Sequence, residues 1–148
     1  MADSSRQTIQ IAAPADRVTR IICDFAAYPR WVGAMKSVEV LSSYDDGYPR
    51  EVRFTVDAGM VADQYTLVYA YADDRSRIEW QLAAPTAVQK RQTGAYDLVA
   101  NPDGSTTVTY TLAVELANPM LGMFRSKAER KILDTALREL KKRAEEPA

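Results

Sequence analysis

The last long segment of the chain, residues 118–147, reads NPMLGMFRSKAERKILDTALRELKKRAEEP. Asn118 is a suitable N-cap, Pro119 suits the first helical position, and no further proline occurs before Pro147. The segment therefore predicts one helix of about 25 residues, roughly 37 Å long, which is enough to cross a whole sheet. Its apolar spacing predicts a buried stripe through Leu121, Phe124, Ala128, Ile132 and Ala136, extended on one flank by Leu133, Leu137 and Leu140.

The other end of the chain predicts a strand followed by helices. Residues 7–11 alternate in polarity, and Pro14 then marks the start of a helix. This helix should stop before Pro29, because the residue preceding a proline is disfavoured in the α region. Residues 28–32 then form a short second helix or a turn. The first helix carries its apolar stripe at Val18, Ile21, Ile22 and Phe25.

The middle of the chain changes to a two-residue period that is typical of strands. Apolar residues alternate with polar ones from Ser37 to Leu116, and turn sequences such as 45–47 and 101–104 separate the runs. One-sided alternation predicts an antiparallel sheet with one face in water. Because the long helix must bury its apolar stripe, we expect the sheet to curl around it.

Short motifs in a distinctive order add a family resemblance. They are Ile11-Ala12-Ala13-Pro14 with Val18, Asp24-Phe25 with Tyr28-Pro29-Arg30-Trp31, Val38-Glu39-Val40, Gly94 with Tyr96, Thr107-Val108-Thr109-Tyr110, and Leu137 to Leu140-Lys141-Lys142. The chain resembles the START-like helix-grip superfamily (SRPBCC), in its polyketide cyclase/dehydrase and lipid-transport branch, especially the small actinobacterial proteins.

The resemblance implies an α+β helix-grip (START/Bet v 1-like) fold in a single domain, residues 1–148. A curved antiparallel sheet of about six to seven strands would wrap around the long C-terminal helix, with two short helices after the first strand. It also implies a cavity between sheet and helix for a small hydrophobic ligand such as a lipid, quinone, sterol or polyketide. Binding or transport of that ligand is the first hypothesis. A cofactor-independent polyketide cyclase/dehydrase and an antitoxin-like interaction module are the alternatives, because a shared fold does not fix an activity.

The composition limits the chemistry. The 148 residues include 19 basic and 20 acidic side chains, so the net charge of −1 argues against a nucleic-acid partner. Histidine is absent, which removes the commonest general base and most catalytic zinc sites, and Cys23 is the single cysteine. We therefore expect no cofactor and no metal. With no signal peptide or long apolar run visible, we expect a cytoplasmic protein, either a monomer or a homodimer.

Aromatic and methionine side chains are the candidate ligand contacts. Large rings on the apolar strand faces would point toward one volume, and eight tyrosines against three phenylalanines leave several hydroxyls in need of partners. Core packing is the alternative role for each ring. The candidates are Trp31, Phe54, Tyr65, Tyr69, Trp80, Tyr96 and Tyr110 on the strands and short helices, with Met120, Met123 and Phe124 at the start of the long helix.

Charged residues give no diagnostic catalytic spacing. The acid-base candidates are Arg53, Asp57, Asp63, Arg77, Glu79 and Arg91, and their positions in the alternation put most of them on the solvent face. Cys23 lies off the apolar arc of the first helix, where an inert thiol is expected. The last helix is basic, which predicts a solvated face or, alternatively, transient contact with an anionic membrane during lipid loading. Its cations are Lys127, Arg130, Lys131, Arg138, Lys141, Lys142 and Arg143.

Overall fold

The computed structural model describes residues 4–57, 62–118 and 125–146. Within these ranges, seven strands form one antiparallel sheet in the order β1-β7-β6-β5-β4-β3-β2. Strands β2 to β7 follow one another as a meander, and β1 returns to pair with β7. The strands are β1 (Ser5–Ile11), β2 (Met35–Ser43), β3 (Pro49–Asp57), β4 (Ala62–Tyr71), β5 (Arg77–Leu82), β6 (Gln89–Ala100) and β7 (Thr106–Leu116).

Three short helical segments connect β1 to β2. They are α1 (Ala15–Cys23), the 3-10 helix η1 (Phe25–Ala27) and α2 (Tyr28–Trp31), and Pro29 lies in the first turn of α2. The first helix ends earlier than predicted, because Asp24 leaves the helical region with φ −88° and ψ 72°. Phe25 is nevertheless buried beside Val18 and Ile22. The predicted apolar stripe is therefore formed by two segments.

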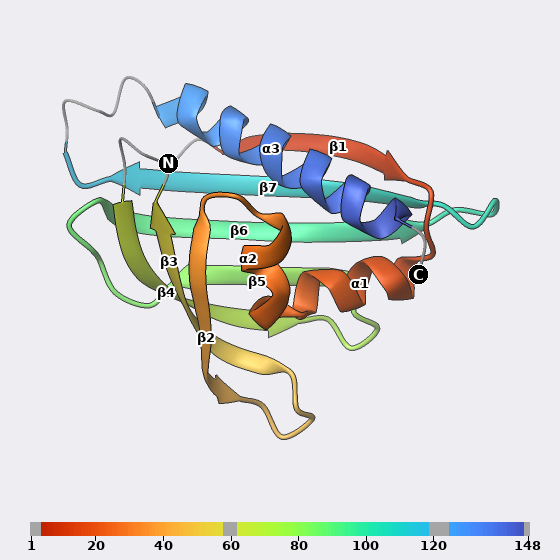
Figure 1. Cartoon of the computed structure of the whole chain (residues 1–148), viewed down its shortest axis with the longest axis horizontal. Coiled ribbons are helices and arrows are strands. Elements are labelled where there is room, and N and C mark those ends of the chain that lie inside the picture. Colours follow the sequence, from red (N-terminus) through yellow and green to blue (C-terminus); the bar gives the residue numbers. More distant parts are fainter. Residues whose placement is uncertain (1–3, 58–61, 119–124, 147–148) are drawn as a thin grey trace.

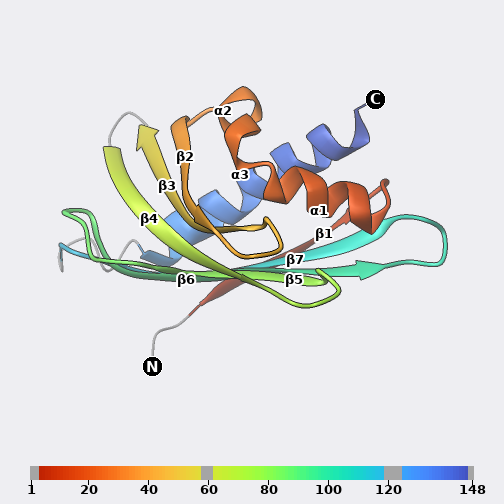
Figure 2. The ribbon, with the colours of Figure 1, turned by 90° about the horizontal axis from the view of Figure 1, so that it is seen from below.

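The sheet is strongly curved, and the helices fill its concave side. Figure 1 shows α3 (Arg125–Glu145) lying along β7 and β1, and Figure 2 shows β2, β3 and β4 rising on the other side of the helices. Contacts of α1 with α3 close the space between the two helical parts. The expected curved sheet around a long C-terminal helix is confirmed.

The buried face of α3 differs from the predicted one. Ile132, expected near the centre of the stripe, is 46% exposed, whereas the expected flank of Leu133, Leu137 and Leu140 is fully buried. The buried face of α3 is thus rotated about the helix axis relative to the predicted one, and Glu129 lies on it. Glu129 is 1% exposed, and its carboxylate accepts hydrogen bonds from the Val114 N–H at 2.7 Å and from Ser5 Oγ at 2.8 Å. The inward face of α3 thus includes an acidic residue, which a prediction from the spacing of apolar residues does not detect.

Two further expectations concern the start of this helix. The predicted start at Asn118 and Pro119 is not tested, since the described part of α3 begins at Arg125. Leu121 and Phe124 of the expected stripe lie outside the described residues as well. No helix in the described ranges combines the length and hydropathy needed to cross a membrane.

The sheet alternates between a buried and a wet face, as predicted. Aromatic and aliphatic side chains point toward the helices, whereas the charged residues between them pair with each other on the outer face. The buried strand residues include Val52, Phe54, Leu67, Tyr69, Ile78, Trp80, Leu98, Val108, Tyr110 and Leu112. The concave face is therefore the place where a ligand site has to be sought.

Candidate functional site

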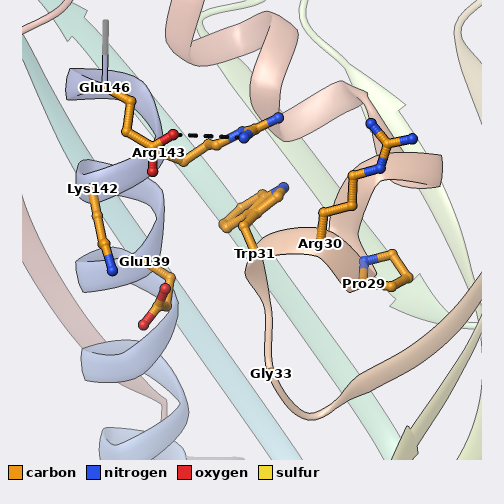
Figure 3. A pocket seen from close by; sticks show the side chains of 8 residues that line it. All are labelled: Pro29, Arg30, Trp31, Gly33, Glu139, Lys142, Arg143 and Glu146. Carbon is orange, nitrogen blue, oxygen red and sulfur yellow. Dashed lines mark ion pairs between the residues drawn. The ribbon is translucent and has the colours of Figure 1, made fainter.

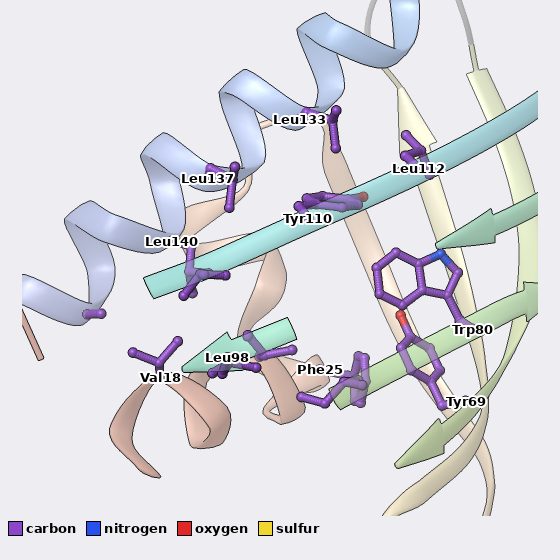
Figure 4. Packing of buried hydrophobic residues seen from close by; sticks show 14 of the residues in the cluster. Val18, Phe25, Tyr69, Trp80, Leu98, Tyr110, Leu112, Leu133, Leu137 and Leu140 are labelled. Atoms are coloured by element: carbon purple, nitrogen blue, oxygen red, sulfur yellow. The ribbon is translucent and has the colours of Figure 1, made fainter. Parts of the chain in front are cut away.

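Four aromatic side chains from four consecutive strands meet on the concave face. Tyr69 on β4 is opposite Trp80 on β5, and Tyr96 on β6 is opposite Tyr110 on β7. The ring of Trp80 lies 5.6 Å from Tyr69, 5.5 Å from Tyr96 and 5.6 Å from Tyr110, measured between centroids. Figure 4 shows Trp80, Tyr69 and Tyr110 on the sheet side, facing Leu133 and Leu137 of α3.

Gly94 provides the space that Trp80 occupies. The two residues are partners across β5 and β6, and the indole lies over the glycine. A Cβ atom at position 94 would lie 2.4 Å from Cζ2 and 2.7 Å from Nε1 of the indole, far closer than real contacts allow. A side chain here would therefore displace the ring, so Gly94 fixes the position of Trp80.

A second aromatic group continues from the first toward the short helices. Phe54 on β3 stacks on Tyr65 of β4 at 5.6 Å and on Tyr28 of α2 at 6.2 Å. Tyr28 in turn contacts Trp31 at 5.2 Å. The structure thus joins all the predicted aromatic candidates of the strands and of α2 into one chain of rings, with Trp31 at its outer end. Met120, Met123 and Phe124 lie outside the described residues.

The hydroxyl groups divide the tyrosines into two groups. Three tyrosines, here called the carbonyl-bonded tyrosines, donate to main-chain carbonyl oxygens: Tyr28 to Ile22, Tyr44 to Tyr69 at 2.6 Å, and Tyr71 to Pro49 at 2.7 Å. Tyr48 instead lies against the Arg75 guanidinium, whose Cζ is 3.9 Å from the centroid of the tyrosine ring. The other four, the inner tyrosines, make no hydrogen bond within the described part of the chain: Tyr65, Tyr69, Tyr96 and Tyr110.

The indole of Trp80 also lacks a hydrogen-bond partner in the described part of the chain. Its Nε1 is buried and has no hydrogen-bond partner among the described residues. Burial raises the pKa values of Tyr69 and Tyr110 well above the usual phenol value, and it also raises those of Tyr65 and Tyr96. All four phenols are therefore protonated at neutral pH. The site presents several N–H and O–H donors inside an aromatic wall.

Comparisons with known proteins agree with this arrangement. The family described as polyketide cyclase / dehydrase and lipid transport matches residues 2–145. The chain belongs to this family. The START-like fold and family expected from the sequence are therefore confirmed, and such a fold is consistent with hydrophobic-ligand binding or with cyclase activity.

Solved structures of this fold superpose on nearly the whole chain. A START superfamily protein from Mycobacterium smegmatis is 26% identical, with a TM-score of 0.88 over 96% of this chain and 97% of that chain. Zhui aromatase/cyclase from Streptomyces sp. R1128 is 20% identical, with a TM-score of 0.78 over 98% and 94%. A protein from Thermus thermophilus is 20% identical, with a TM-score of 0.80 over 96% and 97%. No curated protein matches the sequence.

Most charged candidates in this member of the polyketide cyclase/dehydrase and lipid transport family lie away from the inner rings. Arg53 pairs with Glu39 on the outer face, and Asp57 is exposed. Arg77 pairs with both Glu79 and Asp97, and Arg91 faces Glu115 at 3.8 Å. Asp63 is the exception: it is half-buried and accepts hydrogen bonds from two side chains, Thr86 and Gln89.

Trp31 lies in a charged surface groove between α2 and α3. Figure 3 shows Trp31 beside Arg143, which pairs with Glu146 at 3.7 Å. The groove has a volume of about 310 Å³, and a neighbouring one of about 210 Å³ shares Trp31 and Arg143. Cations and carboxylates both line the larger groove, so it resembles a solvated surface more than a site for an apolar molecule. The surroundings of Trp31 are thus charged and open to solvent, unlike those of the inner tyrosines.

The remaining candidates fit structural roles. Burial raises the pKa of the Cys23 thiol to about 12, so it is protonated and unreactive at neutral pH. Of the basic residues on α3, Lys127, Arg130 and Lys131 are exposed, while Arg138 and Lys141 pair with carboxylates one helical turn away. The described residues contain no group of three or more His, Cys, Asp or Glu side chains arranged to hold a metal ion.

Proposed function

We propose that the protein binds and carries a small hydrophobic ligand on the concave face of the sheet, beneath α3. The ligand would contact Tyr69, Trp80, Tyr96 and Tyr110. One observation carries the proposal: the buried Trp80 Nε1 and the hydroxyls of the four inner tyrosines have no hydrogen-bond acceptor in the described part of the chain.

The energetic cost of these donors argues against a merely filled core. A buried polar group that loses its hydrogen bonds to water without replacement costs about 1–3 kcal/mol. The Trp80 Nε1 bears this cost in the ligand-free protein, and the four inner hydroxyls have no protein acceptor in the described part of the chain. Phenylalanine would fill the same volume as each tyrosine without a hydroxyl to satisfy. The hydroxyls are explained if a bound molecule supplies the acceptors.

Burial and accessibility of the rings agree with a ligand-lined space. Tyr96 and Tyr65 keep part of their accessible surface, and Tyr69 and Tyr110 keep 5% and 7%. Their phenols are nevertheless strongly desolvated, as the raised pKa values indicate. Aromatic side chains largely removed from bulk water, with a few polar groups among them, are typical of the lining of a ligand site. Donors within an apolar wall match a hydrophobic molecule that carries carbonyl oxygens.

Polyketide cyclisation or dehydration is the second candidate, and the same donors favour it. Neutral phenols that donate to a ketone oxygen stabilise the negative charge that develops there when hydroxide or a buffer base from solvent takes a proton from the neighbouring carbon. Acetylnaphthalene, an aromatic methyl ketone, is a suitable probe. If the protein catalyses enolisation, the methyl protons of the bound ketone should exchange with solvent deuterium faster than those of the free ketone. An unchanged exchange rate would restrict the proposal to binding and carriage.

Native mass spectrometry of the protein purified from its own source tests the proposal. A stoichiometric mass addition that organic extraction releases as a lipid, quinone, sterol or polyketide would support it and identify the ligand class. A titration with acetylnaphthalene, followed by the change in protein fluorescence, provides a second test. If nothing co-purifies and a broad panel of hydrophobic compounds does not raise the melting temperature, the proposal is wrong. A protein-interaction role would then be the remaining alternative.

A further inference from the structure

The start of β4 carries an acidic residue on the ligand side of the sheet. Asp63 lies two residues before Tyr65, so strand alternation puts both side chains on the same face. The two groups are close enough for the carboxylate charge to contribute to the raised pKa of Tyr65. Tyr65 in turn contributes to the raised pKa of Tyr110. The carboxylate therefore borders the end of the inner aromatic cluster.

The loop between β5 and β6 holds one side of this carboxylate. Oδ2 of Asp63 accepts hydrogen bonds from Thr86 Oγ1 and from Gln89 Nε2, each at 3.0 Å. Thr86 Oγ1 itself accepts from the main-chain N–H groups of Val88 and Gln89 at 3.1 Å. The other oxygen, Oδ1, receives no hydrogen bond from the described residues. Hydrogen bonds to Oδ2 thus fix the position of the carboxylate, and Oδ1 is left to accept a further hydrogen bond.

Gln89 provides a second unused acceptor. A carboxylate oxygen only accepts, so the amide NH₂ of Gln89 must face Asp63 and the orientation of the amide is determined. Its Oε1 consequently points away from Asp63. Gln89 is only 6% exposed, and this Oε1 is buried with no partner in the part of the chain that the structure describes. Leaving such a buried acceptor unpaired is costly, as it is for the buried Trp80 Nε1.

We propose that Asp63 and Gln89 form an acceptor pole that binds a hydroxyl group of the ligand. This inference rests on the proposed function and specifies the substrate class. The Trp80 indole and the inner tyrosines offer donors for a carbonyl oxygen, while the acceptor pole offers Asp63 Oδ1 and Gln89 Oε1 for an O–H donor. The ligand class that satisfies both ends is an aromatic ketone with a free hydroxyl group on its far ring.

A matched series of three ligands tests the acceptor pole. The compounds are acetylnaphthalene and its two derivatives with a hydroxyl or a methoxy group on the far ring, measured at slightly acidic pH so that the naphthol stays neutral. Wild-type protein should bind the hydroxyl compound roughly tenfold more tightly than the methoxy compound, since only the former donates to the pole. In Gln89→Met and in Asp63→Asn, each of which removes one of the two acceptors, this preference should decrease, and in the double variant it should fall to nearly one. Gln81→Met, on the exposed side of β5, is the matched control and should keep the preference.

The outcomes separate the acceptor pole from the proposed function. If none of the three compounds binds, the proposed function is wrong and the pole with it. If all three bind wild-type protein equally well, the ligand site stands and the acceptor pole is wrong. A Gln89→Met protein that keeps its thermal stability but loses affinity equally for all three compounds would also overturn the pole, because that result indicates a purely structural role.

Discussion

Tyr71 and Tyr110 are the same residue type in one sheet, yet only the hydroxyl of Tyr71 has a hydrogen-bond partner among the described residues. The Tyr71 hydroxyl donates to the carbonyl of Pro49 at 2.7 Å and ties β4 to the start of β3. The Tyr110 hydroxyl, on the inner cluster with Trp80, has no partner among the described residues. The difference teaches that burial alone does not define a tyrosine's role. Whether its hydroxyl has a hydrogen-bond partner is more informative.

The same contrast extends to the two groups of tyrosines. The carbonyl-bonded tyrosines close the fold at the edge near the β2–β3 hairpin and the short helices. The inner tyrosines hold donors for which the described part of the chain supplies no acceptor. We therefore expect substitution to separate stability from binding: one group should contribute to the free energy of unfolding, and the other to ligand affinity.

Alkaline pH should produce the largest effect and should act on both groups. Burial holds the phenols of Tyr28, Tyr69 and Tyr110 neutral in the folded state, with pKa values above the ordinary value of 10.0. Above about pH 10 the unfolded phenols ionise while the folded ones do not, so stability falls by about 1.4 kcal/mol per pH unit for each such tyrosine. Urea unfolding at increasing alkaline pH measures this loss. A free energy of unfolding that stays constant would show that the rings are not desolvated.

Gly94→Ala should have the next largest effect, because the added Cβ meets the Trp80 indole. Overpacking of this kind costs about 1–3 kcal/mol. The displaced ring should also lower acetylnaphthalene affinity. Gly33→Ala is the matched control, since nothing lies within 4 Å of an added Cβ there. Chemical denaturation and ligand titration of both variants check the prediction; equal behaviour of the two would remove Trp80 from the site.

Tyrosine-to-phenylalanine variants should separate the two groups most sharply. Tyr71→Phe loses a hydrogen bond and leaves a carbonyl unpaired, so the free energy of unfolding should fall by about 1 kcal/mol with ligand affinity unchanged. Tyr110→Phe removes a hydroxyl that has no partner, so the ligand-free protein should keep its stability within about 0.5 kcal/mol or gain some. Its affinity for acetylnaphthalene should fall about fivefold to tenfold. The reverse ranking of the two variants would contradict the comparison.

Arg91→Ala should have the smallest effect. The Arg91 side chain is 83% exposed, and its ion pair with Glu115 spans 3.8 Å on the outer face. Exposed pairs of this kind contribute about 0–1 kcal/mol, so stability should change by less than about 0.5 kcal/mol and affinity not at all. A marked loss of ligand affinity in this variant would indicate that the ligand binds on the outer face of the sheet and not on the inner one.

Sequence periodicity predicted the parts of the fold and site that depend on local geometry. Alternation in strands brought Phe54, Tyr69, Trp80, Tyr96 and Tyr110 to one face, because every second side chain of a strand points the same way. The order of the motifs predicted the family, and the length of the last helix predicted that it lies across the sheet.

Other features depend on contacts that the sequence does not encode locally. The register shift between Gln89 and Arg91 interrupts the alternation of β6 and turns Gln89 inward. Counting apolar residues along α3 missed Glu129, because a charged residue was not expected to be buried. Whether a tyrosine hydroxyl reaches a carbonyl, as Tyr71 reaches Pro49, depends on how β3 and β4 approach each other in the folded chain.

The infrared carbonyl stretch of isotope-labelled acetylnaphthalene, bound to wild-type protein and to Tyr110→Phe, tests the central claim most directly. Hydrogen bonds from the inner tyrosines and the Trp80 indole should shift the stretch below its frequency in hexane, and Tyr110→Phe should move it part of the way back. A bound carbonyl that absorbs at its hexane frequency in both proteins would contradict the claim that these buried donors are held for a ligand.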